Sequence, residues 1–348
     1  MIILKYNFFV FSIKKYFFTI LILIFLIGLL SFSTSNIQAA KDGLVLWAEA
    51  VVPSLFPFFV ASSLLCQTNI ISIFGKYLGK LMHPLFNVPG ESTIALIIGA
   101  ISGYPVGAKV VCQLLNQKVI NKDEAERLVA FCNNSGPLFI IGTIGIVLYN
   151  NKYIGFLLLV THILSAISVG IIYKFWSPNT YNKKISKLKN NYNQNNYIKE
   201  QDSNSFITFR NFGEILGNSI KSSIQSILQI GGFIVIFSVI LSLIKNTNFF
   251  NFLSSFDTVF SMPNRFCESI FSGILELTNG VKLLSTLNLK TLNILFTAFL
   301  IGFGGISVLL QVFSIIAKEH LSIRPYLIGK LIQGIIATVY TYIFLCFL

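Results

Sequence analysis

Apolar stretches separated by short polar segments make up most of the chain. An α-helix needs about 20 predominantly apolar residues to cross the hydrocarbon core of a bilayer. The pattern predicts seven spans, at approximately 16–32, 43–65, 128–149, 154–176, 224–244, 292–316 and 326–347. Two further apolar segments, 92–115 and 269–284, are predicted to be re-entrant hairpins, because each arm is too short to cross about 30 Å at 1.5 Å per residue.

Helix-breaking residues interrupt the apolar stretches at matching places in the two halves of the chain. The first hairpin turns at SGYPVG (102–107), and NNSGP (133–137) breaks the span that follows. The second hairpin turns at ELTNG (276–280), and GFGG (302–305) lies within the next span. Broken helices survive at membrane depth only where protein covers them or where they line a polar cavity. Interruptions that recur in two halves indicate a transporter's binding site.

The number of crossings predicts how the halves are related. Each half has a span, a hairpin that does not cross, a broken span and a final span, so an odd number of crossings makes the halves inverted. The predicted fold is an all-α integral membrane protein with two inverted repeats, re-entrant hairpins and discontinuous helices. The predicted segments are an N-terminal transmembrane helix or signal anchor (1–42), a first repeat (43–176), a polar basic cytoplasmic linker (177–208) and a second, inverted repeat (209–348).

The first segment has two interpretations. IQAA (37–40) resembles a signal-peptide cleavage site, whereas the length of the apolar run 16–32 favours an uncleaved helix. Either way, the chain would emerge on the outer side of the membrane.

Composition and charge agree with a membrane protein. The 348 residues are 54% hydrophobic and only 11% charged, well below the charged share of a soluble domain. The net charge of +13 comes from Lys and Arg in loops and at the ends of spans, as the positive-inside rule predicts, and so does not indicate a nucleic-acid partner. The five Cys residues show no CxxC spacing and indicate neither a metal site nor a disulfide framework.

Three local features carry structural predictions of their own. Pro53 and Pro57 should distort the helix over 43–65, since proline removes a donor and clashes with the preceding turn. The paired glycines Gly231 and Gly232 should weaken the span over 224–244. The helix before the NNSGP break should begin with Asn121 or Asp123 as its N-cap.

A set of motifs resembles a known family. The motifs are PSLFPFF (53–59), SGYPVGAK (102–109), EAERLVAFCNNSGPLFIIGTIG (124–145), IGGFIVIFSVI (230–240), ELTNG (276–280) and GFGGISVLLQV (302–312). Together they resemble the sporulation integral membrane protein YlbJ family, which belongs to the group with nucleoside-recognition "Gate" domains. The resemblance covers about 43–348 without the linker.

The resemblance implies a role in endospore formation, in the mother-cell or outer forespore membrane. It further implies movement of dipicolinate toward the forespore. Because the Gate group resembles concentrative nucleoside transporters, a small planar anionic or nucleoside-like solute is the expected substrate class. Besides the bilayer, the expected partners are further copies of the chain or other sporulation membrane proteins.

The residues themselves suggest a site for an anion. Lys109 and Lys282 follow the two hairpin turns at equivalent positions, and Glu276 precedes the second turn. Charges inside a membrane cost about 2.5 to 3.5 kcal/mol on insertion scales, so they tend to be paired or functional. Half-helix N-termini would add a positive field. The candidate hydrogen-bonding residues are Asn133, Asn134, Ser135, Thr278, Asn279, Ser307 and Gln311, and Tyr104 or Phe139 could stack on an aromatic ring.

Structural interpretations compete with this site. Lys109 could extend to the interface or pair with Glu276, Asn133 to Ser135 could merely satisfy broken backbone, and the glycines of 302–305 could be a helix-packing surface. No motif of a hydrolase, metalloenzyme or phosphate-binding loop is present, so we expect neither an enzyme nor a cofactor, and the coupling ion stays open. Among the three His, His162 lies within a span. The alternative to secondary transport is a non-transporting membrane scaffold or assembly factor for the spore envelope.

Overall fold

The part of the chain described by the computed structural model is helical and contains no strand, which confirms the all-α class. The described residues are 2–65, 70–176, 212–247, 249–259, 262–287 and 290–347. The predicted linker 177–208 lies outside them.

Four stretches of the described residues are long and apolar enough to cross a membrane. They are α8 (Lys152–Tyr173), α11 (Phe212–Lys245), the combined stretch Thr291–Glu319 and α17 (Arg324–Phe347). The number rises to six if each of two sharply bent helix pairs counts as one span. These findings support an integral membrane protein, whereas the count of seven spans and the inverted relation of the halves remain predictions.

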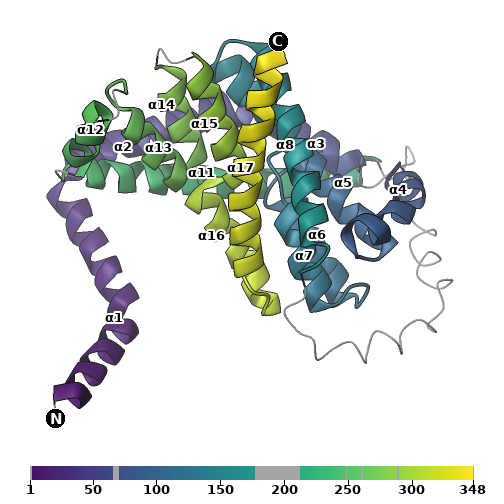
Figure 1. The fold of residues 1–348 in the computed structure, drawn as a ribbon, viewed down its shortest axis with the longest axis horizontal. Helices are drawn as coiled ribbons and strands as arrows, with labels where there is room; N and C mark the ends of the chain where they lie inside the picture. The colour runs from purple at the N-terminus through teal and green to yellow at the C-terminus, as the bar shows by residue number, and fades with distance from the viewer. Residues whose placement is uncertain are drawn as a thin grey trace.

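The N-terminal helix α1 (Ile2–Ser31) projects away from the other helices (Figure 1). The chain bends by 99° between α1 and the helical stretch Ser33–Val51 that follows it. The elements that follow α1 are α2 (Ser33–Leu46), the π-helical turn η1 (Trp47–Val51), α3 (Val52–Leu65), α4 (Ile70–Phe86) and the short 3₁₀ turn Gly90–Ser92.

The helix over 43–65 is irregular before the first of its two predicted breakers, Pro53, whereas α3 continues as an α-helix through Pro57. The turn η1 ends two residues before Pro53, which has no N–H to donate to the preceding turn. One carbonyl of this turn, Ala50 O, accepts a hydrogen bond from Thr143 Oγ1 at 3.4 Å. The π-helix after the first break therefore contacts the backbone of this turn.

All four predicted interruptions are present. The first hairpin is α5 (Thr93–Ser102) and α6 (Val106–Asn116), and the second is α13 (Phe266–Leu275) and α14 (Leu277–Ser285). The first broken span is α7 (Lys122–Cys132) and the π-helix η3 (Phe139–Leu148). The second is α15 (Lys290–Phe303) and α16 (Gly305–Ile316), followed by the 3₁₀ turn Ala317–Glu319. At the second break Gly304 and Gly305 have φ of 85° and 79°, values that favour glycine.

The expectation of a weak point at Gly231 and Gly232 is wrong, because α11 continues through both residues. A Cβ at Gly231 would lie 2.7 Å from the indole ring of Trp47, whose Nε1 donates to Ile227 O at 3.0 Å. Gly231 thus makes room for an aromatic ring of the first half. One helix that the apolar pattern did not predict, α12 (Phe249–Val259), lies before the second hairpin.

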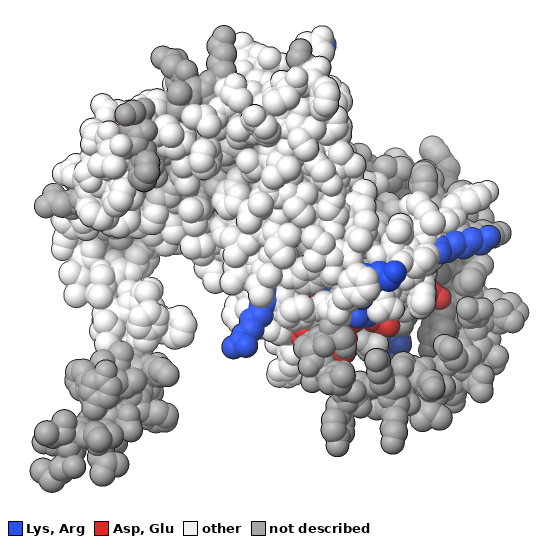
Figure 2. Space-filling view, in the orientation of Figure 1, with Lys and Arg blue, Asp and Glu red and all other residues white. Residues whose placement is uncertain are grey.

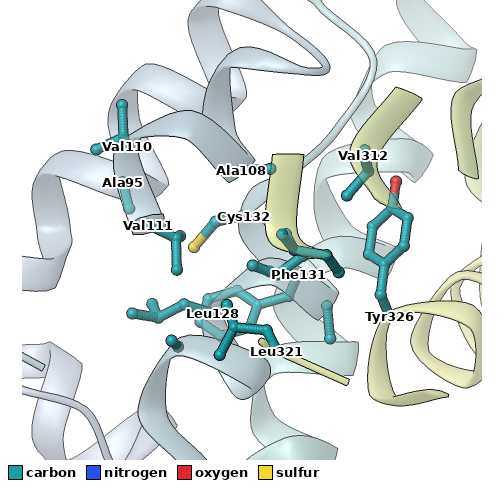
Figure 3. Packing of buried hydrophobic residues seen from close by; sticks show 14 of the residues in the cluster. Ala95, Ala108, Val110, Val111, Leu128, Phe131, Cys132, Val312, Leu321 and Tyr326 are labelled. Atoms are coloured by element: carbon teal, nitrogen blue, oxygen red, sulfur yellow. The ribbon is translucent and has the colours of Figure 1, made fainter. Parts of the chain in front are cut away.

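Helices from both halves of the chain share the interior. Side by side in Figure 1, α8 and α17 pack along their lengths, and α15 packs on α17 with Gly302 against the backbone of Gly334. Figure 3 shows one apolar cluster that includes Val111 and Cys132 of the first half and Val312 and Tyr326 of the second. The halves therefore form one body around the interruptions.

The visible charged side chains are concentrated in one part of the surface. On the face shown in Figure 2, they gather toward the end where α7 and α17 begin, and most of the surface is uncharged. At this end a hydrogen bond also connects the two halves of the chain, since Ser322 N donates to Glu126 Oε1 at 2.9 Å. Asn121 caps α7 with a reciprocal capping box to Glu124, in agreement with the first of the two predicted caps.

Candidate functional site

The turns of both hairpins and both broken spans meet around a small cavity, which we call the central cavity. The hairpin turns and breaks contribute Ser102, Gly103, Tyr104, Gly136, Phe139, Glu276, Thr278, Ser307, Val308 and Gln311. Helices α3 and α11 cover it with Leu55, Phe58, Phe59, Ile230, Phe233 and Ile234. Its volume is about 30 Å³, enough for one or two water molecules. A planar ring would enter only if covering side chains such as Phe58 and Phe233 moved.

Glu276 is the carboxylate of the central cavity, and it caps its own half-helix. The residue is 4% exposed, and its Oε1 and Oε2 accept hydrogen bonds from Thr278 N at 3.1 Å and Asn279 N at 2.7 Å. These N–H groups are donors that a helix N-terminus leaves unpaired. The positive end of α14 therefore faces a carboxylate of the protein itself, and not an open place for a bound anion.

Asn133 pairs with a backbone N–H at the start of α6, the second helix of the first hairpin. Its Oδ1 accepts from Ala108 N in the first turn of α6 at 3.3 Å, and its Nδ2 donates to the Tyr326 hydroxyl at 2.9 Å. The first break is thereby joined to the first hairpin and to α17. This amide thus pairs with backbone of the first hairpin, whereas the structural interpretation placed its partners at the break itself.

Asn134 pairs with a backbone carbonyl near the end of α7 and makes a second connection to α17. Its Nδ2 donates to Phe131 O at 2.6 Å, and its Oδ1 accepts from Lys330 Nζ at 3.1 Å and from Gln333 Nε2 at 2.9 Å. Lys330 Nζ also donates to Gln333 Oε1 at 2.7 Å. His162 of α8 completes the group, since its Nε2 accepts from Ser135 N at 3.2 Å and its Nδ1 lies 3.5 Å from Gln333 Nε2.

The residues Asn134, Ser135, His162, Lys330 and Gln333 form what we call the Lys330 cluster. Their exposed fractions are 5% or less. Sequence reasoning singled out His162 but missed Lys330 and Gln333, as well as Tyr326. The available signal was a lysine inside the apolar run YLIGKLIQG (326–334), since an ionisable residue within a span is a functional candidate by default.

The two hairpin lysines lie elsewhere. Lys109 and Lys282 are exposed on α6 and α14 and do not line the central cavity. Glu276 makes no ion pair with Lys109, and the ion pairs of the described residues join Glu268 to Lys245 and Arg265. A binding role for the hairpin lysines stays a prediction.

The other predicted residues surround the central cavity or support it. Tyr104, Thr278, Ser307 and Gln311 line it, and Asn279 Nδ2 donates to Ser238 Oγ of α11 at 2.9 Å. Gln311 is 2% exposed, and within the described part of the chain its Oε1 has no hydrogen-bond partner. This oxygen is an acceptor available to a water molecule or a polar solute.

In the ranges that the structure describes, no group of three or more His, Cys, Asp or Glu side chains is arranged to hold a metal ion. The arrangement provides a small, mostly apolar cavity with hydroxyls, an amide and a carboxylate, next to a buried cationic cluster.

Comparisons with known proteins identify what this chain is similar to. Residues 48–175 match a family model described as nucleoside recognition. The chain is 34% identical over 322 residues to the sporulation integral membrane protein YlbJ of Bacillus subtilis (strain 168), covering 89% of this chain and 78% of that protein. No solved structure matches.

Proposed function

The chain belongs to the family of the sporulation integral membrane protein YlbJ, and from this premise we propose that it is a secondary transporter of a small planar anion. Dipicolinate is the favoured solute. The proposed location is the mother-cell or outer forespore membrane, and the proposed direction is toward the forespore. The match to a nucleoside-recognition model supports a planar, ring-containing solute.

The observation that carries the proposal is the meeting of both hairpin turns and both breaks at the central cavity. Discontinuous helices whose ends converge are the construction that many transporters use for a solute site near the membrane midplane. Polar groups there are expensive, so their concentration at one point needs a reason beyond packing. Gln311 Oε1, Ser307 and Thr278 could orient a solute, with Tyr104 or Phe139 against its ring.

The small volume of the cavity indicates a closed conformation. A ring compound needs several times about 30 Å³, so it requires helices to separate around the cavity. The aromatic cover from α3 and α11 is the element expected to move, because Phe58 and Phe233 come from helices outside the two hairpins. Movement of such a cover is one way in which access to a solute site changes.

The carboxylate of Glu276 sets a condition on charge. An anion in the central cavity would lie close to a carboxylate, and like charges repel strongly where water is excluded. The proposal therefore includes a proton that binds Glu276 when the anion enters. Transport of the anion is then coupled to proton movement.

The test is uptake of labelled dipicolinate, with a nucleoside as comparison, by liposomes that hold the purified protein. Glu276→Gln mimics the protonated side chain, so we expect exchange of solute to continue while accumulation driven by a proton gradient is lost. Glu268→Gln is the matched control in the same hairpin, and it should accumulate solute as the wild type does. The double variant Lys109→Ala Lys282→Ala tests the predicted role of the hairpin lysines.

A non-transporting scaffold is the second candidate, favoured by the pairing of half-helix ends with the protein's own side chains. It predicts that folded wild-type protein takes up neither dipicolinate nor nucleoside. It also predicts that loss of the protein misplaces another component of the spore envelope.

A further inference from the structure

Lys330 is a buried cation whose surroundings contain oxygen acceptors but no paired carboxylate in the described part of the chain. It is 3% exposed and lies six residues after the start of α17, about 9 Å along the helix. A buried ammonium group normally has an anionic partner. Here Nζ donates to two amide oxygens, Asn134 Oδ1 at 3.1 Å and Gln333 Oε1 at 2.7 Å.

The orientation of both amides follows from their other contacts. Asn134 Nδ2 donates to Phe131 O at 2.6 Å, which turns its oxygen toward α17. Gln333 Nε2 donates to that oxygen at 2.9 Å, which turns the Gln333 oxygen toward Lys330. The carbonyl of Phe131 therefore sets the orientation of the Asn134 amide, which in turn sets that of Gln333. As a result, both amides turn their oxygens toward the ammonium group of Lys330.

Among the described residues, no Asp or Glu side chain forms an ion pair or a hydrogen bond with the cluster. His162 of α8 lies beyond Gln333 and accepts from the backbone of Ser135. On α17 itself, the ring centroid of Tyr326 lies 5.7 Å from Lys330 Nζ, a cation–π distance. The favourable field comes instead from the C-terminal end of α7, where the helix dipole is negative.

A cation at the C-terminal end of a half-helix, surrounded by oxygens, is the arrangement by which transporters of this construction hold a coupling Na⁺. We propose that the ammonium group of Lys330 is a built-in cation at the first break, in the place where a coupling metal ion would otherwise bind. Transport by this protein is then independent of Na⁺ at that break. The cluster joins α7, α8 and α17 without needing an ion from solution.

This inference rests on the proposed transport function for its physiological meaning, but its test measures stability and needs no transport. The experiment uses the purified full-length protein in detergent and follows Tm in sodium, choline and methylammonium chloride at equal concentration. The wild type should unfold at the same temperature in sodium and in choline. Lys330→Ala should lower Tm by about 4 °C or more, because the amide oxygens lose their cation.

Chemical rescue distinguishes a cation site from ordinary packing. Methylammonium, which has the same heavy atoms as the Cε–Nζ end of lysine, should restore at least half of the lost Tm in Lys330→Ala, and choline should restore none. Lys318→Ala, at an exposed lysine near the end of α16, should behave as the wild type in all three salts. If Lys330→Ala does not fold, Lys330→Gln, which keeps polar atoms in the cluster, is measured in the same way.

Two results would overturn the inference. One is a saturable rise of wild-type Tm with sodium over choline, since it would show that the protein binds Na⁺ in addition to Lys330. The other is a lowered Tm in both Lys330 variants that no small cation restores, since packing alone would then explain the lysine. If the liposomes take up no solute but methylammonium restores the Tm of Lys330→Ala, the proposed transport is rejected and the built-in cation is supported.

Discussion

Gly99 of α5 packs directly against the backbone of the first break. A Cβ built at Gly99 would overlap the carbonyl oxygen of Cys132 and lie 2.9 Å from its carbonyl carbon and 3.3 Å from the Cα of Gly107. All three atoms belong to backbone, so no side-chain rotation could relieve the overlap. The variant Gly99→Ala must therefore separate the first hairpin from the break or distort one of them.

The cost of this separation can be bounded. Insertion of a methyl group into a tightly packed interior costs about 1–3 kcal/mol, and rigid backbone on the receiving side favours the upper end. Replacement of a helical glycine by alanine returns up to about 1 kcal/mol through helix propensity. We expect Gly99→Ala to lower the free energy of unfolding by about 2 kcal/mol.

The matched control is Gly232→Ala in α11, where a Cβ would have no heavy atom within 4 Å. It should be neutral or stabilise the protein by up to about 1 kcal/mol. The assay is unfolding in mixed micelles with an increasing fraction of SDS, followed by the fluorescence of Trp47 and Trp176. Equal midpoints for Gly99→Ala and Gly232→Ala would refute the close contact between the first hairpin and the first break.

Two further predictions concern the charged end of the helices. Arg127→Met removes the hydrogen bonds that the guanidinium donates to Trp176 O at 2.8 Å and to Asn87 O at 2.9 Å. It should destabilise the protein by about 2–4 kcal/mol in the same SDS assay. An unchanged midpoint would show that water replaces the guanidinium. Asn121→Ala removes the capping box with Glu124 and should cost about 1 kcal/mol, and a midpoint equal to that of the wild type would contradict a stabilising role of the cap.

The sequence predicted the interruptions of the fold because their cause is local. Proline, glycine and clustered amides cannot continue a lipid-facing helix, so 102–107, 133–137 and 302–305 could be recognised without a structure. The continuity of α11 through Gly231 could not be recognised from the sequence. The same residue type that breaks a helix also allows close packing, and only the position of Trp47 decides between the two roles.

The chemistry of the site was predicted less completely. Residues at the interruptions, such as Glu276 and Gln311, do line the central cavity, because chain breaks and cavity coincide. Whether a lysine on a half-helix points inward depends on the rotation of that helix, which the hairpin sequences do not reveal. Lys330 lies within the unbroken helix α17, where no interruption of the sequence marks it.

The central claim is that the central cavity binds the transported solute, and protection of a cysteine placed in its wall tests this most directly. Val308, which is 4% exposed and lines the cavity, is replaced by cysteine in a background where Cys66, Cys267 and Cys346 are serine. We predict that a membrane-impermeant thiol reagent labels Val308→Cys slowly and that dipicolinate slows this labelling in a saturable manner. Labelling at the same rate with and without saturating dipicolinate or nucleoside would contradict the claim.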